Sequence, residues 1–354
     1  MRILFLSEAI SPHIARWQKA FTELGWETLL ASCDYTDGFN GHRLSPKAAA
    51  GGPQRYLSIV DQVEKLASDF QPHLINAHFL PTYGLTAAMA NIHPLALTLW
   101  GSDILLSAQK GFLQRWRSRF VLRRSDLVVA DAQCALDVAK AIASIQRQLV
   151  VSFGVSRVWY ESGLVRELKE SNTLQILSCR KFEPLYDVQT LIKAARLLRD
   201  DGFNFHLTLV GSGSLESNLR TLAHSQGIAD RITYTGALGD EQLFNAYRRS
   251  DIYVSTALSD TTSVSLLEAM SQKLYPIVTD IPGNREWLTS DRYFFKSGDV
   301  ADLAGKIKLG ASRQAREEAY SNYQPLLVQK GIRDDQMRIA DLTFRKVIDE
   351  YPRR

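Results

Sequence analysis

The stretch "DIYVSTALSDTTSVSLLEAMSQKLYPIVTD", residues 251–280, holds two short apolar runs on either side of a polar loop and a segment with helical spacing. The runs "DIYVST" and "PIVTD" are apolar without alternation, which is typical of parallel strands buried on both faces. Between them, "SVSLLEAMSQK" repeats Val264, Leu267 and Met270 every three residues and predicts a helix. The order strand, helix, strand predicts a parallel α/β unit.

The same organisation extends over the chain. Seven more apolar runs predict strands: "RILFLS", "ETLLAS", "HLINAH", "LALTLW", "DLVVAD", "LQILSC" and "FHLTLVG". Helical spacing lies between them, for example in "PHIARWQKAFTELG", which has Pro12 near its start and Gly25 as a stop, and in "DVQTLIKAARLLRDDG". The sequence therefore predicts an α/β fold with parallel sheets.

The polar segment 152–173, "SFGVSRVWYESGLVRELKESNT", has no strand of its own and is interpreted as a linker. It separates two predicted doubly wound, Rossmann-like domains, residues 1–160 and 174–325, each of ordinary domain size. Ligands of such folds bind at the carboxyl ends of the strands, so we expect a cleft where the two domains face each other. Residues 326–354 include the helical pattern "RIADLTFRKVIDEY", which we expect to return to the first domain.

The composition is that of a globular protein, with 354 residues, 45% hydrophobic residues and a net charge of +4. This mild charge does not indicate nucleic-acid binding. Cys33, Cys134 and Cys179 are odd in number and widely separated, which argues against disulfides and a zinc site and favours the reducing cytoplasm. The first apolar run is too short for a signal peptide, and the longest apolar stretch is interrupted by polar residues and a proline.

The loop "SDTTS", 259–263, follows a predicted strand and precedes a predicted helix, where free backbone N–H groups favour an anion. The hydroxyl groups of Thr261, Thr262 and Ser263 add donors there. Eight helical residues rise about 12 Å, so Asp260 and Glu268 lie too far apart for a glycosidase pair and suit two ends of an elongated ligand. The alternative is a capping residue and a surface glutamate, and the spacing alone leaves both interpretations open.

This stretch resembles the retaining glycosyltransferases of family 4, which have the GT-B architecture of two facing Rossmann-like domains. Their signature is a Glu, seven residues, and a second Glu followed by Ala and Met. Glu268, Ala269 and Met270 match the second half, and Asp260 stands at the first Glu. The resemblance implies that Glu268 accepts hydrogen bonds from the nucleotide ribose and that Asp260 addresses the donor sugar. It also implies donor contacts from the backbone near Thr262, Ser263 and Val264.

A second match is "ILSCRKFEPLYDVQTLI", where the family carries an Arg and, six residues later, a Lys that neutralise the leaving diphosphate. Here Arg180 is present and Tyr186 stands at the Lys position, where it can donate only one neutral hydrogen bond unless Lys181 swings in to replace the charge. An Arg offers phosphate a charged two-pronged donor. The alternative for Arg180 is an ordinary surface residue after a strand.

Two further segments are weaker matches. "LVGSGSLESNL" supplies Gly211 and Gly213, which allow a backbone to approach a ligand closely, but the third glycine of a dinucleotide fingerprint is missing. In "ITYTGALGDEQ", the resemblance implies that the loop holding Leu238 lies against the nucleobase.

The first domain resembles the family less specifically. "SPHIARW" stands where many members have a glycine-rich loop, and His13 there is either a site residue or a residue that begins a helix. "AHFLPTYG" and "LTLWGSDI" follow strands and supply the acceptor-side candidates His78, Tyr83, Trp100 and Ser102. Asp103 either addresses a sugar hydroxyl or caps a helix. The catalytic candidates are Asp260, Arg180, Asp103 and His13.

The segment 110–124, "KGFLQRWRSRFVLRR", gathers Phe112, Leu113, Trp116 and Phe120 on one helical face, flanked by arginines. This pattern suits either peripheral contact with an anionic membrane or a core face with a solvated rim.

The function that the resemblance implies is transfer of a sugar from a nucleoside diphosphate donor to a hydroxyl of a glycan, glycolipid or polysaccharide precursor, with retention of configuration. The absence of an Asp-x-Asp motif predicts no metal, and no other cofactor is expected. We expect a cytoplasmic protein, peripheral on the inner face of the membrane if the segment 110–124 binds lipid. The alternatives are an epimerase or phosphorylase on the same fold, or a non-catalytic binding protein. The binding protein is motivated by three departures from the family: Tyr186 in place of Lys, Asp260 in place of Glu, and Trp100, where some members have a functional His.

Overall fold

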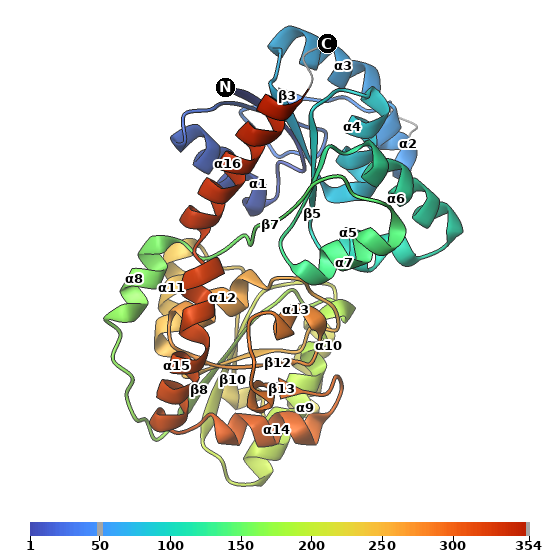
Figure 1. The fold of residues 1–354 in the computed structure, drawn as a ribbon. Helices are drawn as coiled ribbons and strands as arrows, with labels where there is room; N and C mark the ends of the chain where they lie inside the picture. The colour runs from blue at the N-terminus through green and yellow to red at the C-terminus, as the bar shows by residue number, and fades with distance from the viewer. Residues whose placement is uncertain (48–51, 352–354) are drawn as a thin grey trace. The chain divides into compact units, whose positions relative to one another are not determined.

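The computed structural model describes residues 1–47 and 52–351 and divides the chain into two compact units. Unit 1 is Met1–Phe153 together with Asp334–Arg354, and unit 2 is Gly154–Arg333 (Figure 1). The first division lies between residues 153 and 154 rather than at the predicted residue 160.

Unit 1 is built on a seven-stranded sheet in the order β3-β2-β1-β4-β5-β6-β7, in which every pairing is parallel. The strands are β1 (Arg2–Leu6), β2 (Glu27–Ser32), β3 (His42–Arg43), β4 (Leu74–His78), β5 (Leu95–Leu99), β6 (Leu127–Ala130) and β7 (Gln148–Val150). The central strands are fully buried because helices cover the sheet. The strand order reverses between β1 and β4, and such a reversal opens a ligand crevice at the carboxyl ends of the two strands.

The helices of unit 1 connect these strands. They are α1 (Pro12–Glu23), α2 (Gly52–Leu57), α3 (Val60–Phe70), η1 (Phe79–Gly84), α4 (Leu85–Ala90), α5 (Ser102–Leu105), η2 (Ser107–Gln109), α6 (Phe112–Arg124) and α7 (Gln133–Ile142). Helix α1 begins as its sequence predicts, since the Ser11 side chain accepts a hydrogen bond from the His13 N–H and Pro12 occupies the first turn. Gly25 follows it with a positive φ of 85°.

The C-terminal helix α16 (Arg333–Glu350) packs within unit 1. The indole N–H of Trp26 donates to Asp341 over 2.6 Å, and the ring of Phe344 lies 5.3 Å from that of Phe21. The predicted third segment begins at residue 326, but residues up to Lys330 belong to the preceding helix α15 (Arg313–Lys330) of unit 2. The apolar positions of α16 thus find their partner on α1.

Unit 2 contains a six-stranded parallel sheet in the order β10-β9-β8-β11-β12-β13. The strands are β8 (Leu174–Cys179), β9 (Phe205–Val210), β10 (Ile232–Gly236), β11 (Ile252–Ser255), β12 (Tyr275–Thr279) and β13 (Phe294–Phe295). The order reverses between β8 and β11. A ligand crevice is therefore expected after Cys179 and Ser255.

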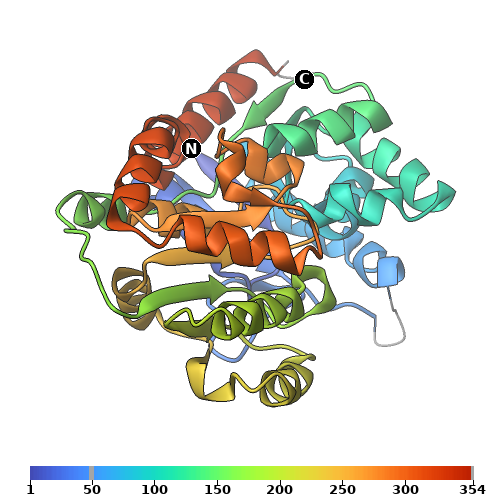
Figure 2. The same ribbon diagram turned by 90° about the horizontal axis from the view of Figure 1, so that it is seen from below.

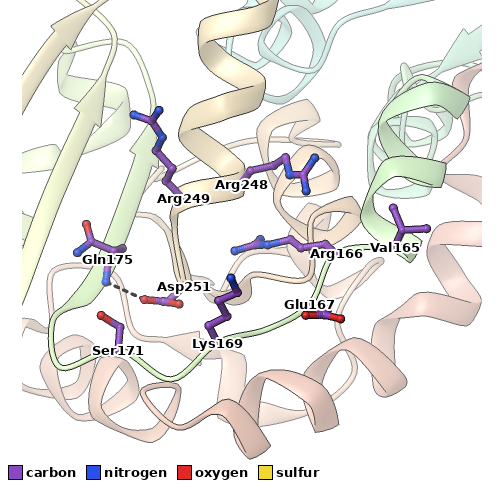
Figure 3. A pocket seen from close by; sticks show the side chains of 9 residues that line it. All are labelled: Val165, Arg166, Glu167, Lys169, Ser171, Gln175, Arg248, Arg249 and Asp251. Atoms are coloured by element: carbon purple, nitrogen blue, oxygen red, sulfur yellow. Dashed lines mark hydrogen bonds between the residues drawn. The ribbon is translucent and has the colours of Figure 1, made fainter.

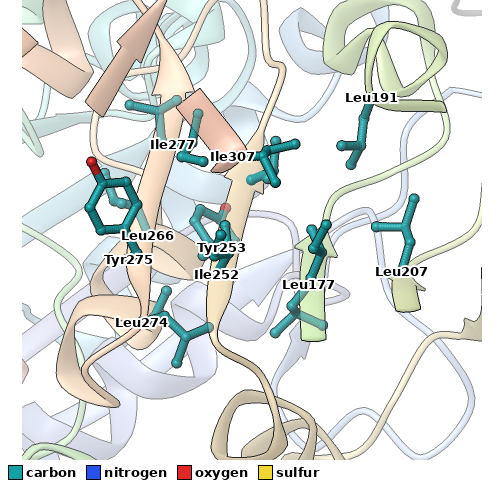
Figure 4. Close-up of a cluster of buried hydrophobic side chains, with 14 of the residues drawn as sticks. Leu177, Leu191, Leu207, Ile252, Tyr253, Leu266, Leu274, Tyr275, Ile277 and Ile307 are labelled. Carbon is teal, nitrogen blue, oxygen red and sulfur yellow. The ribbon is translucent and has the colours of Figure 1, made fainter. Parts of the chain in front are cut away.

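Helices lie on both sides of this sheet, as Figure 2 shows. They are α8 (Arg157–Leu164), η3 (Pro184–Tyr186), α9 (Val188–Asp200), α10 (Glu216–Ser225), η4 (Ala229–Arg231), α11 (Asp240–Arg249), α12 (Val264–Ser271), α13 (Pro282–Arg285), η5 (Asp291–Tyr293), α14 (Val300–Leu309) and α15. Buried side chains of β8, β9, β11 and β12 pack with those of α9, α12 and α14 into the core drawn in Figure 4.

The segment 152–173 is not a bare linker, which corrects the interpretation from the sequence. It contains α8, whose first turn is capped by Ser156. A Cβ added at Gly163 would lie 1.7 Å from the Ser271 carbonyl oxygen, so this glycine allows α8 to lie against the end of α12. Ser156 was the sequence signal for this helix, because serine is a common residue at helix starts.

No helix among residues 1–47 and 52–351 combines the length and the apolar character that crossing a membrane requires.

Candidate functional site

Arg180 and Asp260 meet at the carboxyl ends of β8 and β11, where the strand order of unit 2 reverses. Arg180 directly follows β8, and Asp260 lies in the loop between β11 and α12. Nη1 of Arg180 lies 3.0 Å from Oδ2 of Asp260. The guanidinium also donates from Nε to Ser255 Oγ over 2.9 Å and from Nη2 to Ser263 Oγ. The Tyr186 ring lies 5.7 Å from the guanidinium carbon.

These contacts correct the alternative of an ordinary surface arginine, because the Arg180 side chain is only 10% exposed. Burial works to lower the pKa of Arg180, but Tyr253 and Asp260 outweigh it and raise the pKa above its ordinary value. The guanidinium is therefore a permanent cation at the strand ends. It can accept an anion in a fixed orientation because two serine hydroxyls hold its plane.

The loop residues before α12 divide between the site and the protein interior. Ser263 caps the helix, since its Oγ accepts a hydrogen bond from Leu266 N–H over 3.2 Å. Thr262 is buried and accepts a hydrogen bond from the Trp287 indole over 3.2 Å. Thr261 is also buried, so neither threonine hydroxyl is the outward donor that the sequence predicts. Val264, the first residue of the helix, is half-buried.

Glu268 is not a surface glutamate. It is 8% exposed, and its Oε2 accepts a hydrogen bond from the Tyr247 hydroxyl over 2.9 Å. Burial, and then the nearby Cys179 and Glu268, raise the pKa of Tyr247 well above its ordinary value, so this phenol stays a donor. Burial also raises the pKa of Cys179 to about 12 and keeps its thiol neutral. The Tyr247 hydroxyl thus fixes the buried Glu268 carboxylate in position. A carboxylate fixed in this way can accept hydrogen bonds from ligand hydroxyls.

The estimated separation of Asp260 and Glu268 along a single helix does not apply, because α12 begins only at Val264. Asp260 belongs to the loop and is paired with Arg180, whereas Glu268 lies in the second turn of the helix and is bound by Tyr247. The two carboxylates thus occupy different environments.

The two glycines after β9 have a structural role that their sequence pattern does not reveal. Gly211 has a φ of 142°, and a Cβ there would lie 2.1 Å from the Arg180 carbonyl oxygen. A Cβ at Gly213 would lie 2.5 Å from the Phe182 carbonyl oxygen. The close backbone approach that the glycines allow is to the segment carrying Arg180, rather than directly to a ligand. Lys181 is exposed beside it, and Leu238 is half-buried against the core of unit 2.

In unit 1, His78 and Trp100 are joined at the carboxyl ends of β4 and β5. The Trp100 indole donates to His78 Nδ1 over 3.0 Å, and His78 Nε2 lies 2.7 Å from Asn76 Oδ1. Nδ1 is therefore the acceptor, and Nε2 carries the proton. Burial and the nearby His13 lower the pKa of His78 to about 3, so its ring is neutral. The His13 ring is half-buried and stacks on Phe153 at 4.8 Å.

Asp103 holds backbone rather than presenting a free carboxylate. It is completely buried; Oδ2 accepts from Leu80 N–H over 2.9 Å, and Oδ1 accepts from the N–H groups of Trp100 and Ile104, each over 3.0 Å. Asp103 lies inside α5, whose N-cap is Gly101 and has no side-chain cap, so Asp103 is not the helix cap that the sequence offered as an alternative. Ser102, its neighbour, is exposed at the start of α5.

Tyr83 is also buried, contrary to its predicted place among the acceptor contacts. Its hydroxyl donates to Asp34 Oδ2 over 2.8 Å and accepts from Cys33 N–H over 3.0 Å. The apolar run after β4 forms η1, and this turn directs the ring into unit 1.

A crevice of about 480 Å³ in unit 2 lies at the opposite ends of the strands from Arg180 (Figure 3). It includes Gln175 at the start of β8 and Asp251 directly before β11, and the Gln175 N–H donates to Asp251 over 3.0 Å. Arg166 in its wall donates to the Ser250 carbonyl over 2.7 Å. These are the amino ends of the strands, so the crevice is separate from the Arg180 site.

Across the described ranges 1–47 and 52–351, no three His, Cys, Asp or Glu side chains cluster in a way that could hold a metal ion.

Two family models match the chain. One for group 1 glycosyl transferases matches residues 165–325, and a glycosyl transferase 4-like model matches residues 2–132. Together they cover about four fifths of the sequence. The chain belongs to the group 1 glycosyltransferases. The first match contains Arg180, Asp260 and Glu268, which the resemblance singled out.

Curated relatives of this glycosyltransferase are distant. Sulfoquinovosyl transferase SQD2 of Arabidopsis thaliana is 25% identical over 256 residues, which are 64% of this chain and 48% of that protein. Serotype-specific mannosyltransferase WbdA of Escherichia coli is 26% identical over 110 residues, 30% of this chain and 14% of that protein. The matched part thus spans about half or less of these relatives.

Solved structures extend the likeness over nearly the whole glycosyltransferase chain. Sucrose-phosphate synthase from Thermosynechococcus elongatus matches with a TM-score of 0.83 at 13% identity, over 99% of this chain and 100% of that one. Anabaena HepE in complex with UDP and glucose matches with a TM-score of 0.78 at 18% identity, over 98% and 100%. The predicted GT-B fold, with its two parallel sheets, is confirmed.

Several residues of the glycosyltransferase site were not predicted from the sequence. Ser255 holds the Arg180 guanidinium, and Tyr247 holds the Glu268 carboxylate. Ser255 is the last residue of β11 at the strand-order reversal, and that position was its only available signal. Tyr247 lies on α11, whose sequence carries no sign of a partner on α12.

Proposed function

We propose that this protein transfers a glycosyl group from a nucleoside diphosphate sugar to an acceptor hydroxyl, with retention of anomeric configuration. The observation that carries the proposal is the buried Arg180 guanidinium at the strand-order reversal of unit 2, oriented by Ser255 and Ser263. In the reaction the bond from the anomeric carbon to the diphosphate breaks, a bond to the acceptor oxygen forms, and the proton of the acceptor hydroxyl passes to the departing diphosphate. Negative charge grows on the diphosphate, so a fixed cation beside it stabilises the transition state.

The ion pair between Arg180 and Asp260 suggests how the donor is received. A diphosphate competes with the Asp260 carboxylate for Nη1 of Arg180, because both are anions and the guanidinium has a limited number of N–H groups. When phosphate takes that N–H group, Asp260 is released toward the sugar. This exchange gives Asp260 the role that the family resemblance implies.

Glu268 would accept hydrogen bonds from the ribose. Its burial and its hydrogen bond from Tyr247 support this assignment, since a fixed carboxylate loses little conformational freedom on binding. The loop with Leu238 would contact the base. We propose uridine nucleotides as the first donors to test, because the similar Anabaena structures contain UDP or UDP-glucose.

On the acceptor side, we propose that Trp100, His13 and the exposed Ser102 contact a glycan or lipid-linked acceptor. Trp100 and His13 pack edge to face, with ring centroids 5.8 Å apart, and aromatic rings are common in sugar recognition because they cover apolar C–H faces. His78 would act through Trp100, whose indole it holds.

We further propose that the reaction needs no metal ion. Arg180 and the amino end of α12 supply positive charge where the diphosphate would lie. Chelation with EDTA should leave the transfer rate unchanged, whereas a rate that falls and recovers with added Mg²⁺ or Mn²⁺ would contradict this part of the proposal.

The test begins with calorimetry of UDP, GDP and ADP against the wild type, Glu268→Ala and Arg180→Ala. We expect one nucleotide to bind the wild type and to bind both variants at least tenfold more weakly, since each loses a charged hydrogen bond. Unchanged affinity in both variants would show that the site is elsewhere.

Product analysis then separates the activities. NMR of a labelled sugar nucleotide with and without an acceptor should reveal a glycoside with the donor's anomeric configuration. An epimerised donor or a sugar phosphate would instead indicate an epimerase or a phosphorylase. Nucleotide binding without turnover would indicate a binding protein, an outcome that the Arg180–Asp260 pair and Tyr186 make worth testing.

A further inference from the structure

Helix α6 of unit 1 carries large apolar side chains that face solvent. Phe112 is 86% exposed, Leu113 67% and Trp116 59%, and we call these three residues the α6 tip. They lie within one turn and a half at the start of the helix, so they form one continuous apolar surface. The alternative from the sequence, a core face made by these residues, is therefore wrong for all three.

The tip is presented by a helix that is already folded. The other face of α6 carries Ser118, Val121 and Leu122, which are buried in unit 1. Arg119 fixes the helix further, because its Nε donates to the Ile142 carbonyl at the end of α7 over 2.9 Å. Binding through the tip therefore requires no folding of α6.

The surroundings of the tip are strongly cationic. The segment 104–125 contains six Lys or Arg residues and no Asp or Glu, so its charge exceeds the net charge of +4 of the whole chain. Among the described residues, none of the six forms an ion pair with a carboxylate. Lys110, two residues before α6, and Arg123, near the end of this helix, are both exposed. We call these two residues the basic rim.

We propose that the α6 tip and the basic rim bind the surface of an anionic lipid bilayer. Phe, Leu and Trp side chains enter the boundary between headgroups and acyl chains, where the indole N–H can still reach polar groups. Lysine and arginine at the same surface are attracted by anionic headgroups. The combination of an exposed apolar tip with uncompensated positive charge matches this partner in both respects.

Charge decides against a second copy of the chain as the occupant. In a two-fold symmetric contact the same patch faces itself, which would bring the cations of one α6 against those of the other. A nucleic acid would match the positive charge. It would not explain why Phe112 and Leu113 are exposed beside Trp116.

The first experiment measures cosedimentation with vesicles of phosphatidylcholine alone or with a third phosphatidylglycerol. We expect binding to the anionic vesicles and little to the neutral ones. Lys110→Gln/Arg123→Gln should weaken partitioning roughly thirtyfold, since each basic residue near an anionic surface contributes about fivefold. Phe112→Ser/Leu113→Ser/Trp116→Ser should abolish it.

Matched controls use exposed residues elsewhere. Val158→Ser/Val165→Ser/Leu342→Ser removes three apolar side chains that are 73%, 78% and 68% exposed, and Lys19→Gln/Arg338→Gln removes two exposed charges. Both should bind as the wild type does, and circular dichroism should show all variants folded. Equal binding to neutral and anionic vesicles, or full binding by the folded tip variant, would overturn the proposal.

Trp116 offers a second, site-specific readout because it is the one exposed tryptophan among the six. Brominated lipid in anionic vesicles should quench its fluorescence, and Trp116→Phe should lose that quenching while still binding. A single-stranded oligonucleotide that binds through Lys110 and Arg123 when vesicles do not would assign this surface to nucleic acid and reject the lipid proposal. Neither result depends on donor binding in unit 2.

Discussion

The carboxylate of Asp260 lies 3.0 Å from Nη1 of Arg180, at the reversal of strand order in unit 2. A residue expected to address the sugar thus neutralises the residue expected to bind the phosphates. The two assignments are compatible only if the ion pair exchanges when the donor binds.

This exchange predicts opposite effects of Asp260→Asn on binding and on turnover. The variant keeps its shape but stops competing as an anion for Arg180, so UDP should bind as tightly as to the wild type or several-fold more tightly. Transfer should fall by at least tenfold, because the sugar loses its carboxylate. Calorimetry and initial rates measure the two effects, with Asp230→Asn as a control; parallel losses of both would reject the exchange.

Arg180→Lys tests whether the guanidinium geometry matters beyond its charge. A lysine keeps one positive charge but cannot contact Ser255, Ser263 and a phosphate together. We expect the Kd for UDP to rise by about tenfold to a hundredfold, since charged hydrogen bonds contribute about 1.5–3 kcal/mol each. Arg220→Lys, at an exposed pair with Glu216, should leave the Kd unchanged. Wild-type affinity in Arg180→Lys would mean that charge alone suffices.

Tyr247→Phe tests the role of the Tyr247 hydroxyl at Glu268. Loss of this donor leaves the buried carboxylate less well bound and should destabilise unit 2 by about 1–3 kcal/mol. If Glu268 binds the ribose, the variant should also discriminate less between UDP and 2′-deoxy-UDP, which a general loss of stability would not produce. Tyr234→Phe, which removes a hydroxyl that donates to the Leu219 carbonyl, is the matched control.

Gly283→Ala tests the packing behind the loop that carries Asp260. A Cβ there would lie 2.1 Å from the Thr261 carbonyl oxygen and 2.6 Å from that of Asp260. The loop must shift, and we expect a loss of about 1–3 kcal/mol in unfolding free energy together with reduced transfer. Gly305→Ala lies in helix α14 with no atom within 4 Å and should stabilise the protein by about 0.5–1 kcal/mol. Similar urea midpoints for the two variants would contradict the steric argument.

The neutral state of His78 predicts a pH-dependent stability of unit 1. Its folded pKa of about 3 lies below the value of 6.5 expected when unfolded, so the unfolded chain takes up the proton first as pH falls. The stability that unit 1 gains from keeping His78 neutral is complete above pH 6.5 and is lost toward pH 3. Between pH 7 and pH 5 the free energy of unfolding should fall by about 2 kcal/mol. Urea denaturation at both pH values should show this loss in the wild type and not in His78→Gln.

The effect of His78 must be separated from that of Asp103, because burial raises the pKa of Asp103 to about 6. Protonation of Asp103 stabilises the folded protein as pH falls, which is opposite to the effect of His78. Comparing two histidine variants separates the two effects. His42→Gln, at an exposed position, should keep the pH dependence of the wild type. An identical slope in His78→Gln and His42→Gln would disprove the assignment.

The strands found from the sequence and those missed differ in one physical respect. All nine predicted strands are present, and the four further strands within residues 1–47 and 52–351, β3, β7, β10 and β13, are the edge strands of the two sheets. An edge strand has one neighbour and a partly exposed surface, so it needs fewer apolar residues and leaves a weaker pattern. Helix α8 was missed because it has only eight residues and buries only Tyr160 and Gly163, which is too short a face for a helical repeat of apolar residues.

The candidate site divides in a similar way. Arg180 and Glu268 were predicted because they belong to sequence patterns at strand ends and helix starts. Tyr83 and Asp103 stand at equivalent positions, but their side chains turn inward to Asp34 and to backbone N–H groups. Position after a strand predicts proximity to the site, whereas side-chain direction depends on packing that no local pattern encodes.

The sequence by itself determined the α/β class, the central strands, the family and the residues at the ends of β8 and β11, because these depend on local periodicity and on motifs within a few turns of chain. Only the tertiary structure decided that Asp260 pairs with Arg180, that Tyr247 binds Glu268, and that the apolar residues of α6 face solvent. Each of these depends on which distant segments become neighbours. That is fixed by the strand order and by the packing of helices on the sheets, which are properties of the whole folded chain.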